Sequence, residues 1–308
     1  MRLVFMMTGE ISEPTFAELL KGPHETVGLV TQPDRPVGRK QVLTAPGVKK
    51  LAMAAGVPVI QPESVRTPEA LAQIREWRPD VIVVMAYGQI LPQSLIEIPE
   101  RAIINLHASL LPKYRGASCI QAALKNGDSE TGWSVIYVVK KLDAGNVILR
   151  QPFAIKPQET GGELHDRLAE KGPEACRAAL EMLEAGDVPG EIQDEGSQTY
   201  APKLLREDGH IDWSASAEEV EKVIRAFDPW PGTFSYLGER RLKIFPQTRV
   251  AEGAGKPGAI LAVHEDGIEV TCGKGSLILG EVQLEGSRRM PSGELARGHQ
   301  EALKGGLK

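Results

Sequence analysis

An asparagine and a histidine stand two residues apart in AIINLHAS, residues 102–109. Side chains two apart on a β-strand point to the same face, so Asn105 and His107 are expected to lie side by side. An amide can donate a hydrogen bond to a developing oxyanion, and an imidazole can donate another or move a proton. The pair therefore suits acyl transfer to an amine, in which attack on the carbonyl carbon builds a tetrahedral intermediate.

A carboxylate beside such a histidine would fix its tautomer or favour its protonated form. Asp143, in KKLDAGNVI, is the candidate because it lies in a glycine-containing loop between two predicted strands. Each residue also has a plain structural interpretation. A histidine at a strand end is often a satisfied structural residue, and an aspartate before Ala-Gly is often a turn former. The residues alone leave both interpretations open.

The elements that must position these residues alternate along the first half of the chain. Apolar, β-branched runs are separated by segments with helical spacing, which predicts a doubly wound, mostly parallel, Rossmann-like α/β sheet. Ligands bind at the carboxyl edge of such a sheet, where Asn105 and His107 would lie. The predicted strands are residues 2–7, 26–31, 57–60, 80–88, 102–109, 133–139 and 146–155, and the predicted helices are residues 14–21, 47–56, 69–77 and 120–127.

The second half of the chain changes character. A long helical pattern over residues 162–184 is expected to break near Gly172-Pro173, and a polar stretch rich in turn residues follows. We expect a catalytic domain over residues 1–189, a linker over 190–208 and a C-terminal domain over 209–308.

Within the C-terminal domain, Ser216 and Glu219 have the spacing of a capping box, which predicts a helix from Ser216 to Phe227. Short strands with close turns come after it, with a hairpin signal at Asp266-Gly267. The pattern predicts a small, OB-like β-barrel.

Composition limits the class of protein. The net charge of -5 argues against a dedicated nucleic-acid binder, so contact with RNA would need local basic patches. No apolar run reaches the roughly 18 to 20 residues of a membrane span, and the first residues do not resemble a secretory signal, so we expect a cytoplasmic protein. Three scattered cysteines without a CxxC pair predict neither a disulfide framework nor a metal site.

Four motifs, in this order, make the chain resemble the folate-dependent formyltransferases. They are TQPDRPVGR (31–39), AYGQILP (86–92), NLHASLLPKYRGASCIQ (105–121) and AFDPWPG (226–232). The resemblance implies 10-formyltetrahydrofolate as the formyl donor, and it implies no metal. It places the family's catalytic Asn, His and Asp on Asn105, His107 and Asp143.

The resemblance also implies where the folate is held. One segment matches the family's contact with tetrahydrofolate, and a second would line the pterin pocket together with the loop around Asp143. The first consists of Ser109, Leu110, Leu111 and Pro112, and the second of Ala86, Tyr87 and Gly88.

The loop QPDRPVGRKQ (32–41) and the C-terminal β domain resemble those of family members that formylate methionyl-initiator tRNA, and the family pattern suggests a monomer. Basic side chains there would position the RNA rather than read its bases. The candidates are Arg35, Arg39, Lys40, Arg240 and Arg241, with Lys243, Arg288 and Arg289 as further surface cations. Two alternatives stay open: a formyltransferase acting on an amino-sugar or other small amine, and a catalytically silent RNA- or folate-binding protein.

Overall fold

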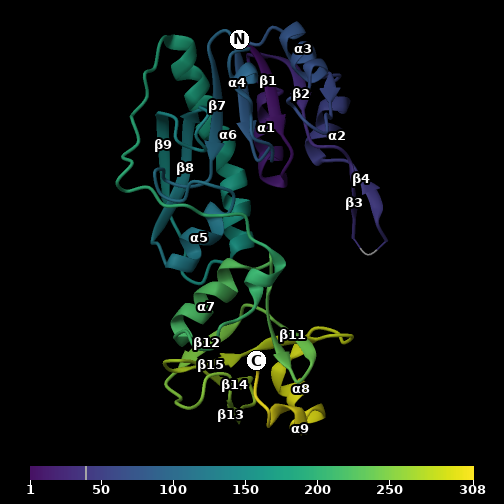
Figure 1. The fold of residues 1–308 in the computed structure, drawn as a ribbon, viewed down its shortest axis with the longest axis vertical. Helices are drawn as coiled ribbons and strands as arrows, with labels where there is room; N and C mark the ends of the chain where they lie inside the picture. The colour runs from purple at the N-terminus through teal and green to yellow at the C-terminus, as the bar shows by residue number, and fades with distance from the viewer. Residues whose placement is uncertain (39) are drawn as a thin grey trace. The chain divides into compact units, whose positions relative to one another are not determined.

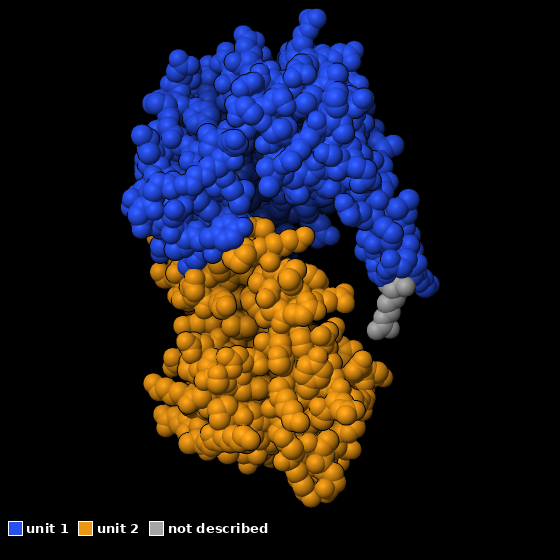
Figure 2. Space-filling view, viewed as in Figure 1, with its two compact units in different colours: residues 1–116, 131–153, 165–201 blue, residues 117–130, 154–164, 202–308 orange. Residues whose placement is uncertain are grey.

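The computed structural model describes residues 1–38 and 40–308, and Arg39 lies outside the described residues. The chain divides into two compact units, which Figure 2 shows in different colours, and Figure 1 labels their helices and strands. Unit 1 consists of Met1–Gly116, Thr131–Phe153 and His165–Ala201, and unit 2 of Ala117–Glu130, Ala154–Leu164 and Pro202–Lys308.

A seven-stranded sheet forms the centre of unit 1. In spatial order its strands are β5 (Val59–Ile60), β2 (Glu25–Val30), β1 (Arg2–Met7), β6 (Val81–Met85), β7 (Ala102–His107), β8 (Glu130–Tyr137) and β9 (Val147–Ala154). The first five pair in parallel, and β8 runs antiparallel to β7. The predicted mostly parallel α/β sheet is therefore confirmed. The strands that follow β1 in the sequence are added first on one side of it, as β2 and β5, and then on the other side, from β6 to β9, so the strand order reverses between β1 and β6.

Helices cover both faces of this sheet, because the side chains of its strands alternate between the faces. On β1, Val4 and Met6 share a core with Leu71 of α3 (Pro68–Glu76), whereas the Phe5 ring meets the Phe16 ring of α1 (Glu13–Leu19) with centroids 5.1 Å apart. The helices of unit 1 are α1 (Glu13–Leu19), α2 (Gly47–Ala54), α3 (Pro68–Glu76), α4 (Gln93–Ile96) and most of α6 (Gly161–Ala185), with a short 3-10 turn at Glu10–Ser12.

The expected break in the long helix is wrong, because α6 is continuous through Pro173. A proline inside a helix removes one backbone hydrogen bond, so tertiary packing must hold the helix together at this point. Gly172 provides that packing: a Cβ built there would lie 2.5 Å from Thr15 Oγ1 and 3.3 Å from Met85 Cε. The glycine lets α6 approach α1 and the sheet closely enough to stabilise the helix across the proline.

The basic loop after β2 forms a small hairpin of β3 (Arg35–Val37) and β4 (Val42–Thr44). Asp34, at its base, accepts hydrogen bonds from Lys49 at 2.8 Å and from Gln61 at 2.7 Å. The hydrogen bond from Gln61, followed by that from Lys49, lowers the pKa of Asp34 below its ordinary value. The hairpin is thus attached to unit 1 by charged and amide contacts at its base.

Unit 2 contains the antiparallel β domain that the sequence predicts. One sheet has the order β10 (Thr233–Leu237), β11 (Arg240–Ile244), β16 (Glu281–Leu284), β17 (Met290–Pro291), and the other the order β12 (Thr248–Ala251), β15 (Ser276–Leu279), β14 (Ile268–Thr271), β13 (Ile260–Val263). Both sheets contribute to one hydrophobic core. The helices are α5 (Cys119–Asn126), α7 (Ala217–Ala226), α8 (Ser292–Gly298) and α9 (Gln300–Leu303), with a 3-10 turn at Arg206–Gly209.

Two local predictions in unit 2 are confirmed. Ser216 and Glu219 form a reciprocal capping box at the start of α7, and Asp266-Gly267 joins the antiparallel strands β13 and β14. Within the expected linker, residues 190–201 belong to unit 1. Among the described residues, no helix is both long and apolar enough to cross a membrane.

Candidate active site

Three predicted side chains converge at the carboxyl end of β7. His107 is buried, with 6% of its surface exposed, and Asn105 is half-buried. Asp143 approaches both from the loop after β8: its Oδ1 lies 3.5 Å from Asn105 Nδ2, and its Oδ2 lies 3.6 Å from His107 Nδ1. An amide, an imidazole and a carboxylate from two separate stretches of chain therefore share one site.

The two ring nitrogens of His107 both face oxygen atoms. Nε2 lies 2.8 Å from the carbonyl oxygen of Tyr114, and Nδ1 faces the Asp143 carboxylate. A carbonyl oxygen can only accept, so Nε2 carries a hydrogen and donates to Tyr114. The separation between Nδ1 and the carboxylate is that of an ion pair, so Asp143 can act on the ring through its charge.

The backbone of Asp143 is held in the left-handed region, with a φ of 48°. Its Oδ2 also accepts a hydrogen bond from the backbone N–H of Gly116 at 2.8 Å, which fixes the direction of the carboxylate. Gly145 makes the turn possible, because a Cβ at that position would lie 1.8 Å from the carbonyl oxygen of Tyr137. Asp and Asn are the residues other than glycine that best tolerate such a backbone conformation.

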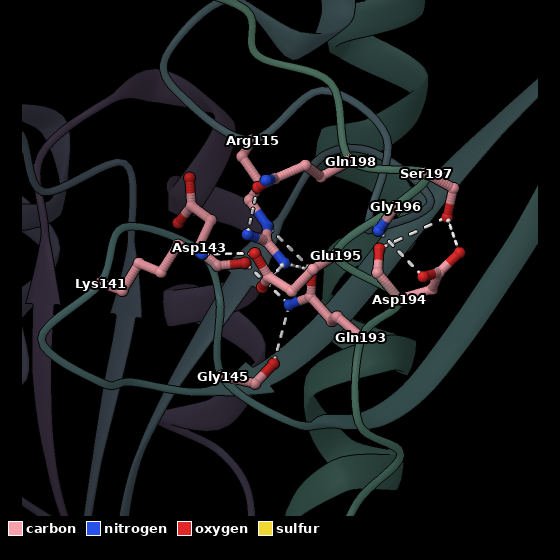
Figure 3. Close-up of polar contacts among 10 residues, drawn as sticks. All are labelled: Arg115, Lys141, Asp143, Gly145, Gln193, Asp194, Glu195, Gly196, Ser197 and Gln198. Carbon is pink, nitrogen blue, oxygen red and sulfur yellow. Dashed lines mark hydrogen bonds and ion pairs between the residues drawn. The ribbon is translucent and has the colours of Figure 1, made fainter.

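Two residues that the sequence interpretation missed support this loop, as Figure 3 shows. Gln193 donates to the carbonyl oxygens of Asp143 and Gly145, at 2.7 and 2.8 Å. Its own carbonyl oxygen accepts from the guanidinium of Arg115, at 3.1 and 2.9 Å. Arg115 stands inside a recognised motif, which was the available signal, whereas Gln193 lies in the stretch expected to be a linker.

The segment predicted to contact folate folds back on itself through a hydrogen bond. Ser109 donates to the carbonyl oxygen of Lys113 at 2.7 Å. The peptide bond between Leu111 and Pro112 is cis. The Leu111 side chain is buried in a small core, whereas Leu110 and Pro112 stay partly exposed. Those last two side chains are thus the ones in this segment that a ligand can reach.

The segment from Ala86 to Gly88 presents its backbone rather than its largest side chain. Ala86 and Gly88 have positive φ values of 49° and 87°. The Tyr87 ring is buried beneath the sheet edge, and this burial raises the pKa of its hydroxyl, which has no hydrogen-bond partner among the described residues. The Tyr87 carbonyl oxygen accepts from Thr8 at 3.3 Å and from Gln32 at 3.2 Å. Any ligand contact at position 87 would come from the main chain.

The hairpin of β3 and β4 carries the predicted basic residues of unit 1. Arg35 and Lys40 are exposed, while the prediction for Arg39 falls outside the described residues. The hairpin also exposes aliphatic side chains that the sequence interpretation did not single out, at 56%, 58% and 67% for Val37, Val42 and Leu43. Exposed apolar groups concentrated on one small element indicate an interaction surface.

The basic candidates of unit 2 are already engaged with neighbouring groups. Arg240 donates to the carbonyl oxygen of Glu285, and the guanidinium of Arg241 lies over the Phe234 ring, 3.8 Å from its centroid. Arg288 and Arg289 form ion pairs with Glu294 and Glu281. Lys243 is exposed on β11.

Comparison with known families defines the class of protein. A family model described as formyl transferase matches residues 1–180, and one described as formyl transferase, C-terminal domain, matches residues 203–300. The chain belongs to the formyl transferase family.

Individual relatives narrow the similarity further. The chain is 50% identical to a methionyl-tRNA formyltransferase of Akkermansia muciniphila, with 97% of each chain covered, and 44% identical to one of Marinobacter nauticus, with 98% of each covered. Its fold is also similar to the crystal structure of HypX from Aquifex aeolicus in complex with tetrahydrofolic acid, with a TM-score of 0.64 at 20% identity. That match covers 99% of this chain and 47% of HypX, so the chain spans about half the length of HypX.

Proposed function

We propose that the protein transfers the formyl group of 10-formyltetrahydrofolate to the amino group of methionyl-initiator tRNA. The observation that carries the proposal is the convergence of Asn105, His107 and Asp143 at one sheet edge, in a chain similar over its full length to methionyl-tRNA formyltransferases. The same similarity favours tRNA over an amino-sugar as the acceptor.

In this reaction the amine nitrogen attacks the formyl carbon, and the bond from that carbon to the folate nitrogen breaks. A proton leaves the amine and reaches the folate nitrogen, which gives formyl-methionyl-tRNA and tetrahydrofolate. The Asn105 amide would donate to the oxyanion of the tetrahedral intermediate. When protonated, the His107 ring would add positive charge near that oxygen, and Asp143 would stabilise this charge and orient the ring.

A proton-transfer role for His107 needs one further step. Its Nε2 faces the Tyr114 carbonyl oxygen, so this contact must be exchanged for the substrate before the nitrogen can accept or give a proton. The resting geometry thus supports the polarising role directly, and it supports the shuttle after a small rotation of the ring.

The folate would lie against the segments 86–88 and 109–112, which follow β6 and β7 at the same edge of the sheet. Support comes from the family and from the tetrahydrofolate complex of HypX, which shares the fold. In this arrangement the backbone of Ala86 to Gly88 supplies polar contacts, and Leu110 and Pro112 supply apolar ones.

The tRNA would be contacted by the hairpin of β3 and β4 and by cations of unit 2. Arg35 and Lys40 can meet phosphates, and the exposed aliphatic side chains beside them can pack against a base or ribose face. Arg240 and Arg241 would contribute phosphate contacts from β11.

The test is an incubation of the protein with 10-formyltetrahydrofolate and methionyl-initiator tRNA, followed by detection of formyl-methionine after the ester is hydrolysed. Formation of formyl-methionine with initiator tRNA, and much less with elongator methionyl-tRNA, supports the proposal. A dTDP-amino-sugar serves as the competing acceptor. Formylation of the sugar alone would transfer the proposal to the small-amine alternative, and no product from folded protein would favour a silent binding protein.

A further inference from the structure

A segment far along the sequence lies across both loops of the candidate site. We name residues 188–201 the strap. Its first part holds the loop that carries Asp143: Tyr137 and Asn146 donate to the carbonyl oxygens of Val188 and Pro189, and Glu191 exchanges two backbone hydrogen bonds of 2.8 Å with Val147.

The second part of the strap holds the loop of residues 112–116. Thr199 accepts from the backbone N–H of Tyr114 at 2.8 Å and from that of Arg115 at 2.9 Å, and Ala201 donates to the Arg115 carbonyl oxygen at 2.7 Å. This loop supplies the carbonyl oxygen of Tyr114 to His107 and the N–H of Gly116 to Asp143. The strap therefore supports the loop that contacts His107 and Asp143 from outside β7.

Gln193, in the middle of the strap, uses its whole hydrogen-bonding capacity. It is buried, with 4% of its surface exposed. A glutamine amide has two donors and two acceptor sites. Both donors reach carbonyl oxygens, those of Asp143 and Gly145, and both acceptor sites receive N–H groups of Arg115. If the amide were flipped, its oxygen would face the two carbonyl oxygens and its NH2 group would face the N–H groups of Arg115. The neighbours of Gln193 therefore determine the orientation of its amide.

Arg115 is the buried partner that holds Gln193 in this orientation. Only 3% of its surface is exposed, and it also donates to Gln198 at 2.5 Å and to Glu195 at 3.0 Å (Figure 3). The hydrogen bond from Arg115, and then that from Lys141, keep the pKa of Glu195 below its ordinary value, so this counter-charge persists at neutral pH. The guanidinium of Arg115 thus links the loop of residues 112–116 to several residues of the strap.

We propose that Gln193 is a positioning residue for formyl transfer, which fixes the left-handed backbone of Asp143 and so sets the carboxylate against His107, with Arg115 orienting Gln193. The inference rests on the proposed function and assigns a role to a residue that lies 50 positions from Asp143 in sequence. Gln193 reaches Asp143 through its main-chain carbonyl oxygen and not through its carboxylate, so it acts through the backbone of that residue rather than on the substrate.

Gln193→Glu separates positioning from simple attachment of the strap. The glutamate has nearly the same shape and pairs with Arg115, yet it cannot donate to the two carbonyl oxygens and instead repels them. Displacement of catalytic groups by about an ångström lowers turnover on the order of a hundredfold, so we expect a fall in kcat of roughly ten- to a hundredfold. A residue that only attached the strap would be replaced by glutamate with little loss of kcat.

Gln193→Asn is the second variant, in case the glutamate impairs folding. It keeps the amide but withdraws it by one methylene, and we expect a smaller fall in kcat. Ser197→Ala is the matched control on the same strap. Among the described residues the Ser197 hydroxyl hydrogen-bonds to Asp194, so its removal should leave kcat as in the wild type. Thermal unfolding of each variant checks that the protein assayed is folded.

A readout without substrate keeps this inference separate from the proposed function. The ring nitrogen signals of His107 in an NMR spectrum, assigned with His107→Gln, report the carboxylate beside the ring. We expect them to shift in both Gln193 variants and to stay unchanged in Ser197→Ala. A folded Gln193→Glu protein with wild-type kcat and unchanged His107 signals would overturn the inference. If the signals shift in the Gln193 variants but the wild type forms no formyl-methionine, only the proposed function is overturned.

Discussion

The Oδ2 atom of Asp143 lies 3.6 Å from Nδ1 of His107, between that ring and the backbone N–H of Gly116 at 2.8 Å. The separation from the ring is that of an ion pair rather than a short hydrogen bond. The carboxylate is therefore positioned mainly by the backbone, and it acts on the histidine through its charge.

Asp143→Asn should test that charge with little change of shape. Asparagine tolerates a positive φ as well as aspartate does, and its amide oxygen can still accept from Gly116. Loss of the negative charge removes the stabilisation of the protonated ring, and we expect kcat for formyl transfer to fall on the order of 100-fold, within the range for acid–base groups. Steady-state kinetics with an unchanged unfolding temperature would check this, and wild-type turnover would contradict the role of the charge.

Asn105→Ala should lower turnover on the order of 100-fold or more, because the hydrogen-bond donor to the oxyanion is lost. The residues proposed to bind folate and tRNA stay in place. Asn105→Asp is the sharper companion, since it keeps the shape and replaces the donor by a negative charge. We expect it to be at least as inactive as the alanine variant, while folate binding measured by fluorescence stays close to the wild type. Near-normal kcat in either variant would remove Asn105 from the mechanism.

The sequence predicts the parts of the site that periodicity controls. Alternation along a strand places Asn105 and His107 on one face, and the glycine-containing loop after the next strand makes Asp143 a candidate. No sequence periodicity predicts the role of Gln193, because its side chain donates hydrogen bonds to main-chain atoms 48 and 50 positions away. Sequence rules read local preference, whereas these contacts depend on tertiary placement.

The helix α6 shows that tertiary packing can also override a local preference that the sequence states clearly. Gly172 and Pro173 are correctly recognised as weak helix formers, and a local rule predicts a break. The close approach of α6 to Thr15 and Met85 at Gly172 overrides that preference. The hairpin of β3 and β4 is a third case: the sequence marks it as basic, yet its exposed aliphatic side chains emerge only from the structure.

Arg35→Ala and Lys40→Ala should weaken binding of methionyl-tRNA and make it less sensitive to salt. Each phosphate contact that is lost should reduce the slope of log affinity against log salt by about one. Binding measured between low and physiological salt would show this, with Lys304→Ala as a control in which the lost cation is exposed and paired with Glu301. Unchanged slopes for both hairpin variants would argue against phosphate contact there.

The thiols of Cys176 and Cys272 should react very slowly in the folded protein. Burial raises the pKa of Cys176 to about 12 and that of Cys272 to about 11. Since the thiolate is the reactive form, burial leaves both side chains mainly as unreactive thiols at pH 8. Alkylation followed by peptide mass analysis should show both protected until urea unfolds the protein, with labelling that rises as the pH is raised. Rapid labelling of either at pH 8 would contradict the burial.

Gly145→Ala should impair the site through the backbone, without removing any functional group. A Cβ at this position would lie 1.8 Å from the Tyr137 carbonyl oxygen, so the loop that carries Asp143 must move. We expect kcat to fall at least tenfold, because a displacement of about an ångström at a catalytic group is sufficient for this, and we expect a lower unfolding temperature. Gly298→Ala is the matched control, since a Cβ there meets no atom within 4 Å. Wild-type kcat in Gly145→Ala would mean that the loop accepts a Cβ at this position without displacing Asp143. The close approach of Gly145 to Tyr137 would then not be what places Asp143 against His107.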